Sequence, residues 1–153
     1  MHRCCVTHLI EKELTESIIG AFYEVYNTLG FGFLEHIYVM ALERELLSGG
    51  HHVAREVQVR ITYKGEELSG QRVDMIVDGK VLVETKSSLD LHPSARRQLR
   101  NYLSATNLEV GLLLHFGPRA TFYREIRTRG WRRWGSPEPK PEGTTQYIPA
   151  RLE

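Results

Sequence analysis

Cysteine is scarce in this chain of 153 residues, and long apolar stretches are missing. The two cysteines, Cys4 and Cys5, are adjacent, so they offer neither a disulfide framework nor the spaced ligands of a zinc motif. No apolar run approaches the ~20 residues that span a bilayer, and the N-terminal residues lack the apolar core of a signal peptide. We therefore expect a cytoplasmic protein that does not enter a membrane.

Motifs for several common chemistries are also absent from the sequence. The histidines form no i, i+4 pair and show no Cys/His spacing typical of zinc. Gly30 and Gly32 are followed by a predicted helix, but no strand precedes them and a third glycine is missing, so they do not match a phosphate-binding loop. These absences remove zinc and nucleotide-loop chemistry from the leading hypotheses.

The overall charge hides a basic segment near the C-terminus. Residues 119–133 contain six arginines against Glu125, a net charge of +5, so the rest of the chain carries −4. Arginines interleaved with aromatic residues suit a phosphate backbone and unstacked bases. The candidate contacts are Arg124, Arg127, Arg129, Trp131, Arg132 and Arg133. The alternative is a solvated basic strand and tail whose tryptophans pack against the domain or a second subunit, which leaves a homodimer open.

Composition predicts one globular domain, because 41% of the residues are hydrophobic and 25% are charged. We expect a core over residues 1–117, a basic aromatic extension over 118–135 that completes the domain, and an irregular Pro-rich tail over 136–153.

Three helices are predicted from the spacing of apolar residues. The first covers residues 14–29, with Thr15 as its cap and Gly30 as its end, and the second covers about 34–47. Proline 93 suits the first turn of a third helix that extends to about residue 105.

Five strands are predicted as well. Apolar alternation indicates a strand over residues 57–63, and two apolar runs at 72–77 and 80–86 indicate the next two. A continuously apolar segment at 110–114 is typical of a buried strand, and 121–127 could add an edge strand. The fold class is therefore α/β, with a central mixed sheet of four to five strands flanked by helices.

Three charged residues lie inside the second and third predicted strands: Asp74, Glu84 and Lys86. Burying such groups is costly unless they are paired or bind a cation. Two carboxylates can hold a hard cation, and a nearby ammonium group can stabilise charge or position water, as Mg²⁺-assisted phosphodiester cleavage requires. The alternative is a hairpin whose edge charges point to solvent.

The turn between these strands decides whether the carboxylates share a face. A two-residue loop at Asp78-Gly79 would place Asp74 and Glu84 on opposite faces, because side chains alternate with a period of two. A three-residue loop, Val77-Asp78-Gly79 with Gly79 left-handed, would place both on one face together with Lys86. A shared metal requires the second arrangement, which we predict.

Helical residues could complete such a site. Glu35 starts the second helix and could reach a cleft beside the sheet, or it could simply be an acid favoured by the helix dipole. Gln98 and Tyr102 are spaced i, i+4 on the third helix and could brace a metal site or contact a phosphate, or form an ordinary half-buried pair. Three arginines on other faces of that helix could meet nucleic acid or be ordinary surface residues: Arg96, Arg97 and Arg100.

The segment Gly32-Phe33-Leu34-Glu35-His36-Ile37-Tyr38 resembles the signature of the small bacterial GxxExxY proteins, which belong to the PD-(D/E)XK nuclease superfamily. The resemblance runs from about residue 15 to 117. It includes Tyr63-Lys64-Gly65, Asp74, Glu84-Thr85-Lys86, Gln98-Leu99-Arg100-Asn101-Tyr102 and Val110-Gly111-Leu112-Leu113. The Gln-x-x-x-Tyr element is similar to that of the RecB-like exonuclease branch. Valine 73 departs from the family pattern, because it replaces the proline that names the superfamily motif.

The resemblance implies a restriction-endonuclease-like core and a nuclease that acts on DNA with Mg²⁺ or Mn²⁺. It implies that the metal ligands are Glu35, Asp74, Glu84 and the Thr85 carbonyl, that Lys86 assists the chemistry, and that Gln98 and Tyr102 support the site. We expect the Glu35 carboxylate to come within metal-bridging reach of Asp74 and Glu84, and at least one carboxyl to have a raised pKa. The alternative function is a non-catalytic nucleic-acid-binding or assembly module on the same fold.

Overall fold

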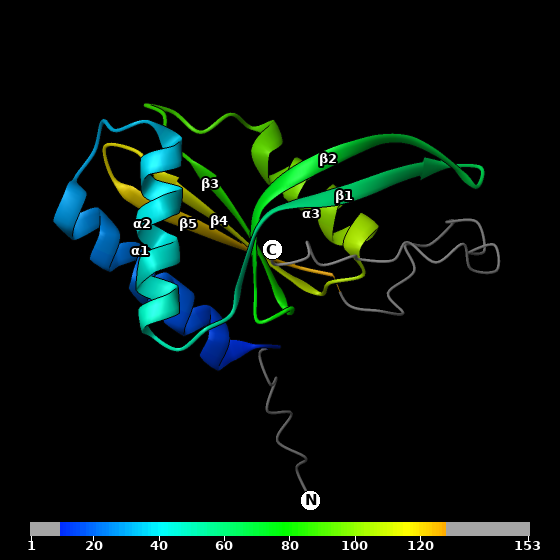
Figure 1. Cartoon of the computed structure of the whole chain (residues 1–153). Helices are drawn as coiled ribbons and strands as arrows, with labels where there is room; N and C mark the ends of the chain where they lie inside the picture. Colours follow the sequence, from blue (N-terminus) through cyan, green and yellow to red (C-terminus); the bar gives the residue numbers. More distant parts are fainter. Residues whose placement is uncertain (1–9, 128–153) are drawn as a thin grey trace, which may run out of the picture.

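One mixed sheet organises the chain in the computed structural model, which describes residues 10–127 (Figure 1). Its strands lie in the order β1-β2-β3-β4-β5, with β3 and β4 parallel and the other neighbours antiparallel. Their bounds are β1 Val53–Tyr63, β2 Glu66–Val77, β3 Val81–Lys86, β4 Val110–Phe116 and β5 Ala120–Ile126. The predicted α/β class and mixed sheet are confirmed.

Helices cover both faces of this sheet. The helices α1 (Lys12–Leu29) and α2 (Glu35–Ser48) pack on one face, where Phe22 and Leu42 meet residues of β3 and β4. The helix α3 (Ser94–Thr106) connects β3 to β4 and packs on the other face through Leu99. All three predicted helices are therefore present. No helix within residues 10–127 is long and apolar enough to cross a membrane.

The start of α1 differs from the prediction. Thr15 lies inside the helix and is buried, and its hydroxyl donates to the carbonyls of Glu11 and Lys12 at 3.0 and 2.9 Å. It is not the cap, because the helix begins at Lys12 and Thr15 bonds back to the preceding turn. Gly30 ends the helix, as predicted, with a φ of 72° that a residue with a Cβ rarely adopts.

The β1 and β2 strands extend far beyond the rest of the sheet as a two-stranded ribbon (Figure 1). All residues from 62 to 72 are exposed, so the ribbon presents both faces to solvent. The sequence predicted β2 to start at residue 72 rather than at Glu66, because an exposed ribbon needs no apolar alternation and most of its residues are polar. The predicted turn at Lys64-Gly65 is present, with positive φ at both residues.

The β2–β3 turn places the charged residues. Val77 pairs with Val81, so the loop is Asp78-Gly79-Lys80, and the predicted loop Val77-Asp78-Gly79 is wrong by one residue. Asp78 and Gly79 both have positive φ, and the Asp78 carboxylate accepts a hydrogen bond from the His52 amide at 2.8 Å, which stabilises this turn. With this register, position 74 lies directly opposite position 84, on one face of the sheet.

Candidate functional site

The candidate site lies where β2 and β3 separate. Their last ladder pair is Met75 with Val83, and beyond it side chains replace the backbone ladder. The Glu84 carboxylate accepts a hydrogen bond from the Asp74 amide at 3.1 Å, and the Asp74 carboxylate accepts one from the Thr85 amide at 2.7 Å. Each carboxylate therefore anchors one oxygen on the opposite strand, which brings the two side chains together at the point of separation.

All three candidate carboxyl groups have a raised pKa. Burial raises the pKa of Glu84 to about 8, and the Asp74 charge adds to this rise, while Lys86 opposes it. Burial also raises the pKa of Asp74, although the hydrogen bond from the Thr85 amide lowers it in part. Burial likewise raises the pKa of Glu35, although the charge of Lys86 lowers it in part. The predicted rise is confirmed. Its leading cause is desolvation rather than the carboxylate repulsion on which the prediction rested.

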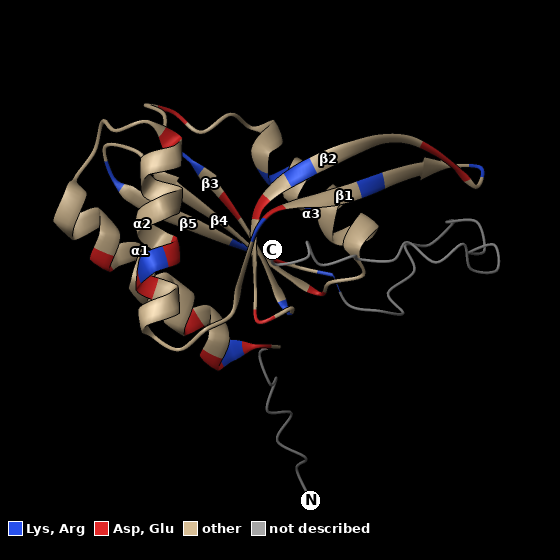
Figure 2. Ribbon diagram, viewed as in Figure 1, with Lys and Arg blue, Asp and Glu red and all other residues tan. Residues whose placement is uncertain are grey.

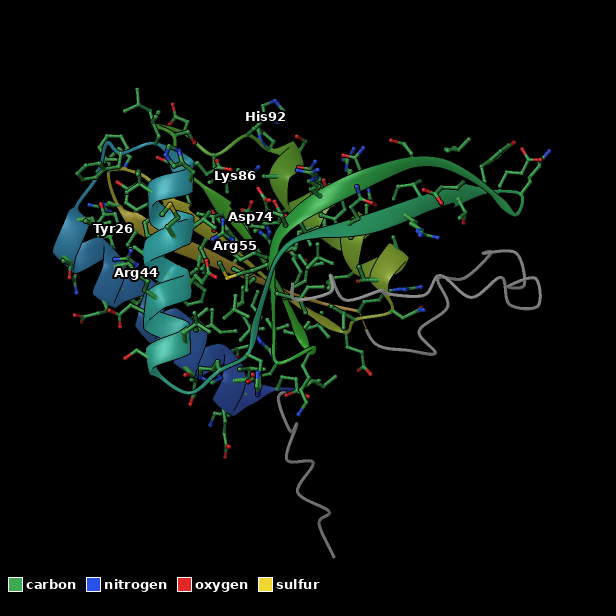
Figure 3. All side chains as sticks on the ribbon, viewed as in Figure 1. Tyr26, Arg44, Arg55, Asp74, Lys86 and His92 are labelled. Carbon is green, nitrogen blue, oxygen red and sulfur yellow. The ribbon has the colours of Figure 1, made fainter. Side chains whose placement is uncertain are left out.

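Lysine 86 shares the face of Glu84 because the two residues are two positions apart on β3. Its Nζ lies 4.0 Å from Glu84 Oε2, and its charge lowers the pKa of Glu35, Asp74 and Glu84 alike. The Lys86 and Asp74 side chains point into the region between the start of α2 and the start of α3 (Figure 3). The Lys86 ammonium group therefore favours the charged form of all three carboxyl groups.

The segment around Glu35 is built by two other residues of the Gly-x-x-Glu-x-x-Tyr pattern. Gly32 has a φ of 114°, which only glycine adopts readily. Tyr38 is fully buried, donates to the Gly30 carbonyl at 2.6 Å and accepts from the Phe33 amide at 3.2 Å. Its ring stacks on Phe116 with centroids 4.2 Å apart. Tyr38 therefore ties the loop before α2 to the core and fixes where the helix begins.

Glu35 is the first residue of α2 and is half-buried. Its carboxylate accepts a hydrogen bond from the Ser87 amide, which directly follows Lys86. However, no group of three His, Cys, Asp or Glu side chains among residues 10–127 is close enough to hold a metal ion. The expected metal-bridging approach of Glu35 to Asp74 and Glu84 is therefore not met. Glu35 acts on the pair electrostatically, since its charge raises the pKa of Glu84.

The α3 helix brings Gln98 and Tyr102 to the same region. Gln98 donates from Nε2 to the Tyr102 hydroxyl at 2.8 Å, and Tyr102 is buried. Burial and the charges of Glu84 and Asp74 raise the Tyr102 pKa, which places the phenol beside the carboxylates. Gly111 on β4 allows α3 to pack closely on the sheet, because a Cβ there would lie 2.9 Å from the Leu99 side chain. The supporting role of Gln98 and Tyr102 stays a prediction, as does metal binding by the Thr85 carbonyl.

Two of the three arginines on α3 turn away from the site. Arg96 and Arg100 both contact the Glu125 carboxylate on β5, at 2.6 and 3.2 Å, and the Arg96 guanidinium lies 4.6 Å from the Tyr123 ring. Since Glu125 is buried, these arginines neutralise it. Arg97 is exposed. Nucleic-acid binding by these three residues stays a prediction, and Figure 2 shows where the basic residues lie.

The basic C-terminal segment is described only in part. The edge strand predicted at 121–127 is present as β5. Arg124 donates to the Ile10 carbonyl, and Arg127 donates to the Ser104 carbonyl at 3.0 Å, near the end of α3. Both arginines therefore have partners within the domain. The remaining candidates lie outside the described residues: Arg129, Trp131, Arg132 and Arg133.

Sequence reasoning missed two residues that act on Asp74. Arg55 on β1 lowers the Asp74 pKa and is paired with Glu43 of α2, while Glu56 raises it. Glu56 also has a left-handed φ of 49° at the position opposite Asp74, so β1 is distorted beside the site. Neither residue belongs to a recognisable spacing, and only the strand pairing brings them to Asp74.

A second polar cluster lies away from this site and was also missed. His51 bonds to Ser17 at 2.7 Å through Nε2 and to Asp78 at 2.8 Å through Nδ1, beside a cavity of about 460 Å³ lined partly by Lys12 and Lys80. This order of residues resembles a catalytic relay, but Ser17 lies inside α1, where backbone amides already bond within the helix. We interpret the cluster as a link between α1, the segment before β1 and the β2–β3 turn.

Comparison with known proteins identifies the family. A model of the PD-(D/E)XK nuclease superfamily matches residues 12–128. The solved structure titled "Crystal structure of SSO0001" is similar, with 26% sequence identity and a TM-score of 0.47 over 76% of this chain and 59% of that chain. The chain thus spans less than two thirds of that relative. No curated protein matches this sequence. The five-stranded mixed sheet flanked by helices is consistent with the restriction-endonuclease-like fold. The chain therefore belongs to the PD-(D/E)XK nuclease superfamily.

Proposed function

We propose that this protein is a nuclease that hydrolyses phosphodiester bonds in DNA with the help of a divalent cation. The observation that carries the proposal is Glu84, a carboxyl group only 7% exposed and placed opposite a second carboxyl group. A fold gains no stability from burying two such acids together. The arrangement is useful if the acids bind a cation and act on a substrate.

The donor set fits Mg²⁺ or Mn²⁺. Asp74 and Glu84 each use one oxygen on an amide of the neighbouring strand, and each has a second oxygen for a ligand. Magnesium keeps several waters and binds through one or two carboxylates, so this pair with a main-chain carbonyl such as that of Thr85 satisfies it without a third side chain. Glu35 would then act by its charge or through a water. A bound cation would supply Lewis-acid stabilisation of the negative charge that develops on the phosphoryl oxygens.

Lysine 86 is assigned to the reaction rather than to the metal. Its ammonium group lies beside Glu84 and can donate hydrogen bonds to phosphate oxygens or to the attacking water. When water attacks, a new phosphorus–oxygen bond forms and the bond to the leaving nucleotide oxygen breaks. The attacking water releases a proton to solvent, the leaving oxygen takes one up from solvent, and negative charge accumulates on the phosphoryl oxygens in between. A preorganised cation lowers the free energy of that state more than that of the ground state.

The finer assignment, to the GxxExxY proteins and the RecB-like branch, is part of this proposal. Gly32, Glu35 and Tyr38 support the first, because each has a separate role in building the start of α2. The bonded pair of Gln98 and Tyr102 beside the carboxylates supports the second.

Cleavage assays test this function. The purified chain is incubated with labelled single- and double-stranded DNA and RNA in Mg²⁺, Mn²⁺ or EDTA. We expect cleavage of DNA with either metal and none with EDTA. A Lys86→Ala variant should be inactive, while Lys80→Ala, which removes an exposed lysine in the β2–β3 turn, should cleave like the wild type. Binding without cleavage in every metal would instead identify a non-catalytic module.

A further inference from the structure

Large apolar side chains are exposed on two connections next to the candidate site. Phe33 and Leu34, on the α1–α2 connection, are 47% and 71% exposed, and Leu89, on the β3–α3 connection, is 70% exposed. Both connections lie at the same end of the sheet (Figure 1). Leu34 immediately precedes Glu35, and Leu89 follows Lys86 by three positions. We call these three residues the apolar lip.

Hydrogen bonds hold this lip against the site. The Ser87 hydroxyl donates to the Phe33 carbonyl at 2.7 Å, which joins the two connections, and the Ser87 amide donates to the Glu35 carboxylate. The Phe33 ring contacts the Tyr38 ring edge-to-face, with centroids 6.1 Å apart, and Phe33 is still 47% exposed. The lip is therefore anchored to the same residues that position Glu35.

The chemistry around the lip indicates what it would contact. Glu35 and Lys86 lie close to the lip residues along the chain. Lys86 and the carboxylate pair suit a phosphodiester group and its cation, whereas the lip side chains offer only apolar contact. A nucleotide combines these two properties, because an anionic phosphate is attached to a flat base with π faces. In continuous duplex those faces are stacked, so apolar side chains reach them only where a base is unpaired or unstacked.

We propose that the apolar lip binds an unpaired base next to the scissile phosphate, so that the protein prefers single strands and frayed ends over continuous duplex. This inference rests on the proposed nuclease function. It adds a substrate class to that function and assigns Phe33 as the main stacking residue.

A binding cycle tests the lip directly. Lys86→Ala protein in Mg²⁺ is titrated with labelled single-stranded DNA and blunt duplex, followed by anisotropy, with and without Phe33→Ala. Each strand is also prepared with one abasic site, moved along the sequence position by position. We expect tighter binding of the single strand, a loss of about 5- to 150-fold on Phe33→Ala, and no effect of that change where the abasic site already removes the stacked base.

Controls separate this inference from the proposed function. Leu89→Ser should also weaken single-strand binding, while Leu47→Ala, an exposed leucine at the far end of α2, should leave it unchanged. The inference is overturned if Phe33→Ala and Leu89→Ser bind as the parent does, if Phe33→Ala weakens intact and abasic strands equally, or if no strand binds. If the wild type cleaves single strands and blunt duplex at equal rates, or if Phe33→Ala and Leu89→Ser keep the wild-type preference, the lip proposal alone is overturned. Absence of cleavage in any metal would overturn the nuclease function.

Discussion

Replacing Glu84 by glutamine should remove much of the pH dependence of folding stability in metal-free protein. The pKa of Glu84 rises from 4.5 to about 8 in the folded state, chiefly because the side chain is buried. Between these pH values the folded protein keeps a proton that the unfolded chain has released. The contribution of Glu84 to stability is therefore greatest below its unfolded pKa and is lost as pH rises toward 8.

The size of the effect follows from the shift. Each pKa unit corresponds to about 1.4 kcal/mol, so ionising Glu84 should lower the free energy of unfolding by about 4 kcal/mol between about pH 5 and pH 9. The raised pKa values of Asp74 and Glu35 act in the same direction. Glutamine keeps the size of the side chain and an oxygen that can accept from the Asp74 amide, but it cannot ionise.

Urea unfolding of both proteins in EDTA at a series of pH values measures this difference. The gain of Glu84→Gln over the wild type should grow by about 4 kcal/mol from about pH 5 to pH 9. Mg²⁺ at about a hundred times its Kd should then restore about 2.7 kcal/mol to the wild type at the alkaline end and much less to the variant.

A matched control is Glu66→Gln, which removes an exposed carboxylate at the tip of the β1–β2 ribbon. It should follow the wild-type profile. If the free energy of unfolding changes with pH in the same way for the wild type and Glu84→Gln, the pKa of Glu84 is not raised in the folded protein. That result would refute the reasoning.

Three further substitutions test separate parts of the site. Lys86→Ala should lower the cleavage rate by about 10²-fold or more while Mg²⁺ still raises the melting temperature, and retained activity in highly purified protein would contradict its role. Asp74→Asn should abolish both cleavage and the Mg²⁺-induced rise in melting temperature, and survival of either would remove Asp74 from the ligands. Tyr38→Phe removes the hydrogen bonds to Gly30 and Phe33 and should lower the free energy of unfolding in urea by about 1–3 kcal/mol, whereas an unchanged value would show that the loop before α2 does not need them.

The sequence alone was sufficient for the elements and their class. Apolar spacing identified three helices and five strands in the right order. Each element must bury one face, and this requirement gives its apolar residues a regular spacing along the chain. The errors lie where that requirement does not apply. Thr15 is a good cap residue in isolation, but α1 begins earlier, and the polar β1–β2 ribbon buries too little to leave a pattern.

The tertiary structure decided how the charged residues meet. The turn at Asp78-Gly79 was recognised, yet the three-residue loop begins one residue later than predicted, and hydrogen bonds from His51 and His52 to Asp78 help to hold it there. Likewise, a count of arginines could not show that Arg96 and Arg100 on α3 neutralise Glu125 on β5.

Residue types and spacing thus determined which groups this protein has for chemistry: Asp74, Glu84 and Lys86 on two adjoining strands. What local sequence could not determine is their environment. The burial that raises the Glu84 pKa comes from packing of segments far apart in the chain, as do the placement of Glu35 at Ser87 and the lip beside it. Desolvation and charge coupling depend on distances in space, and these exist only once the chain has folded.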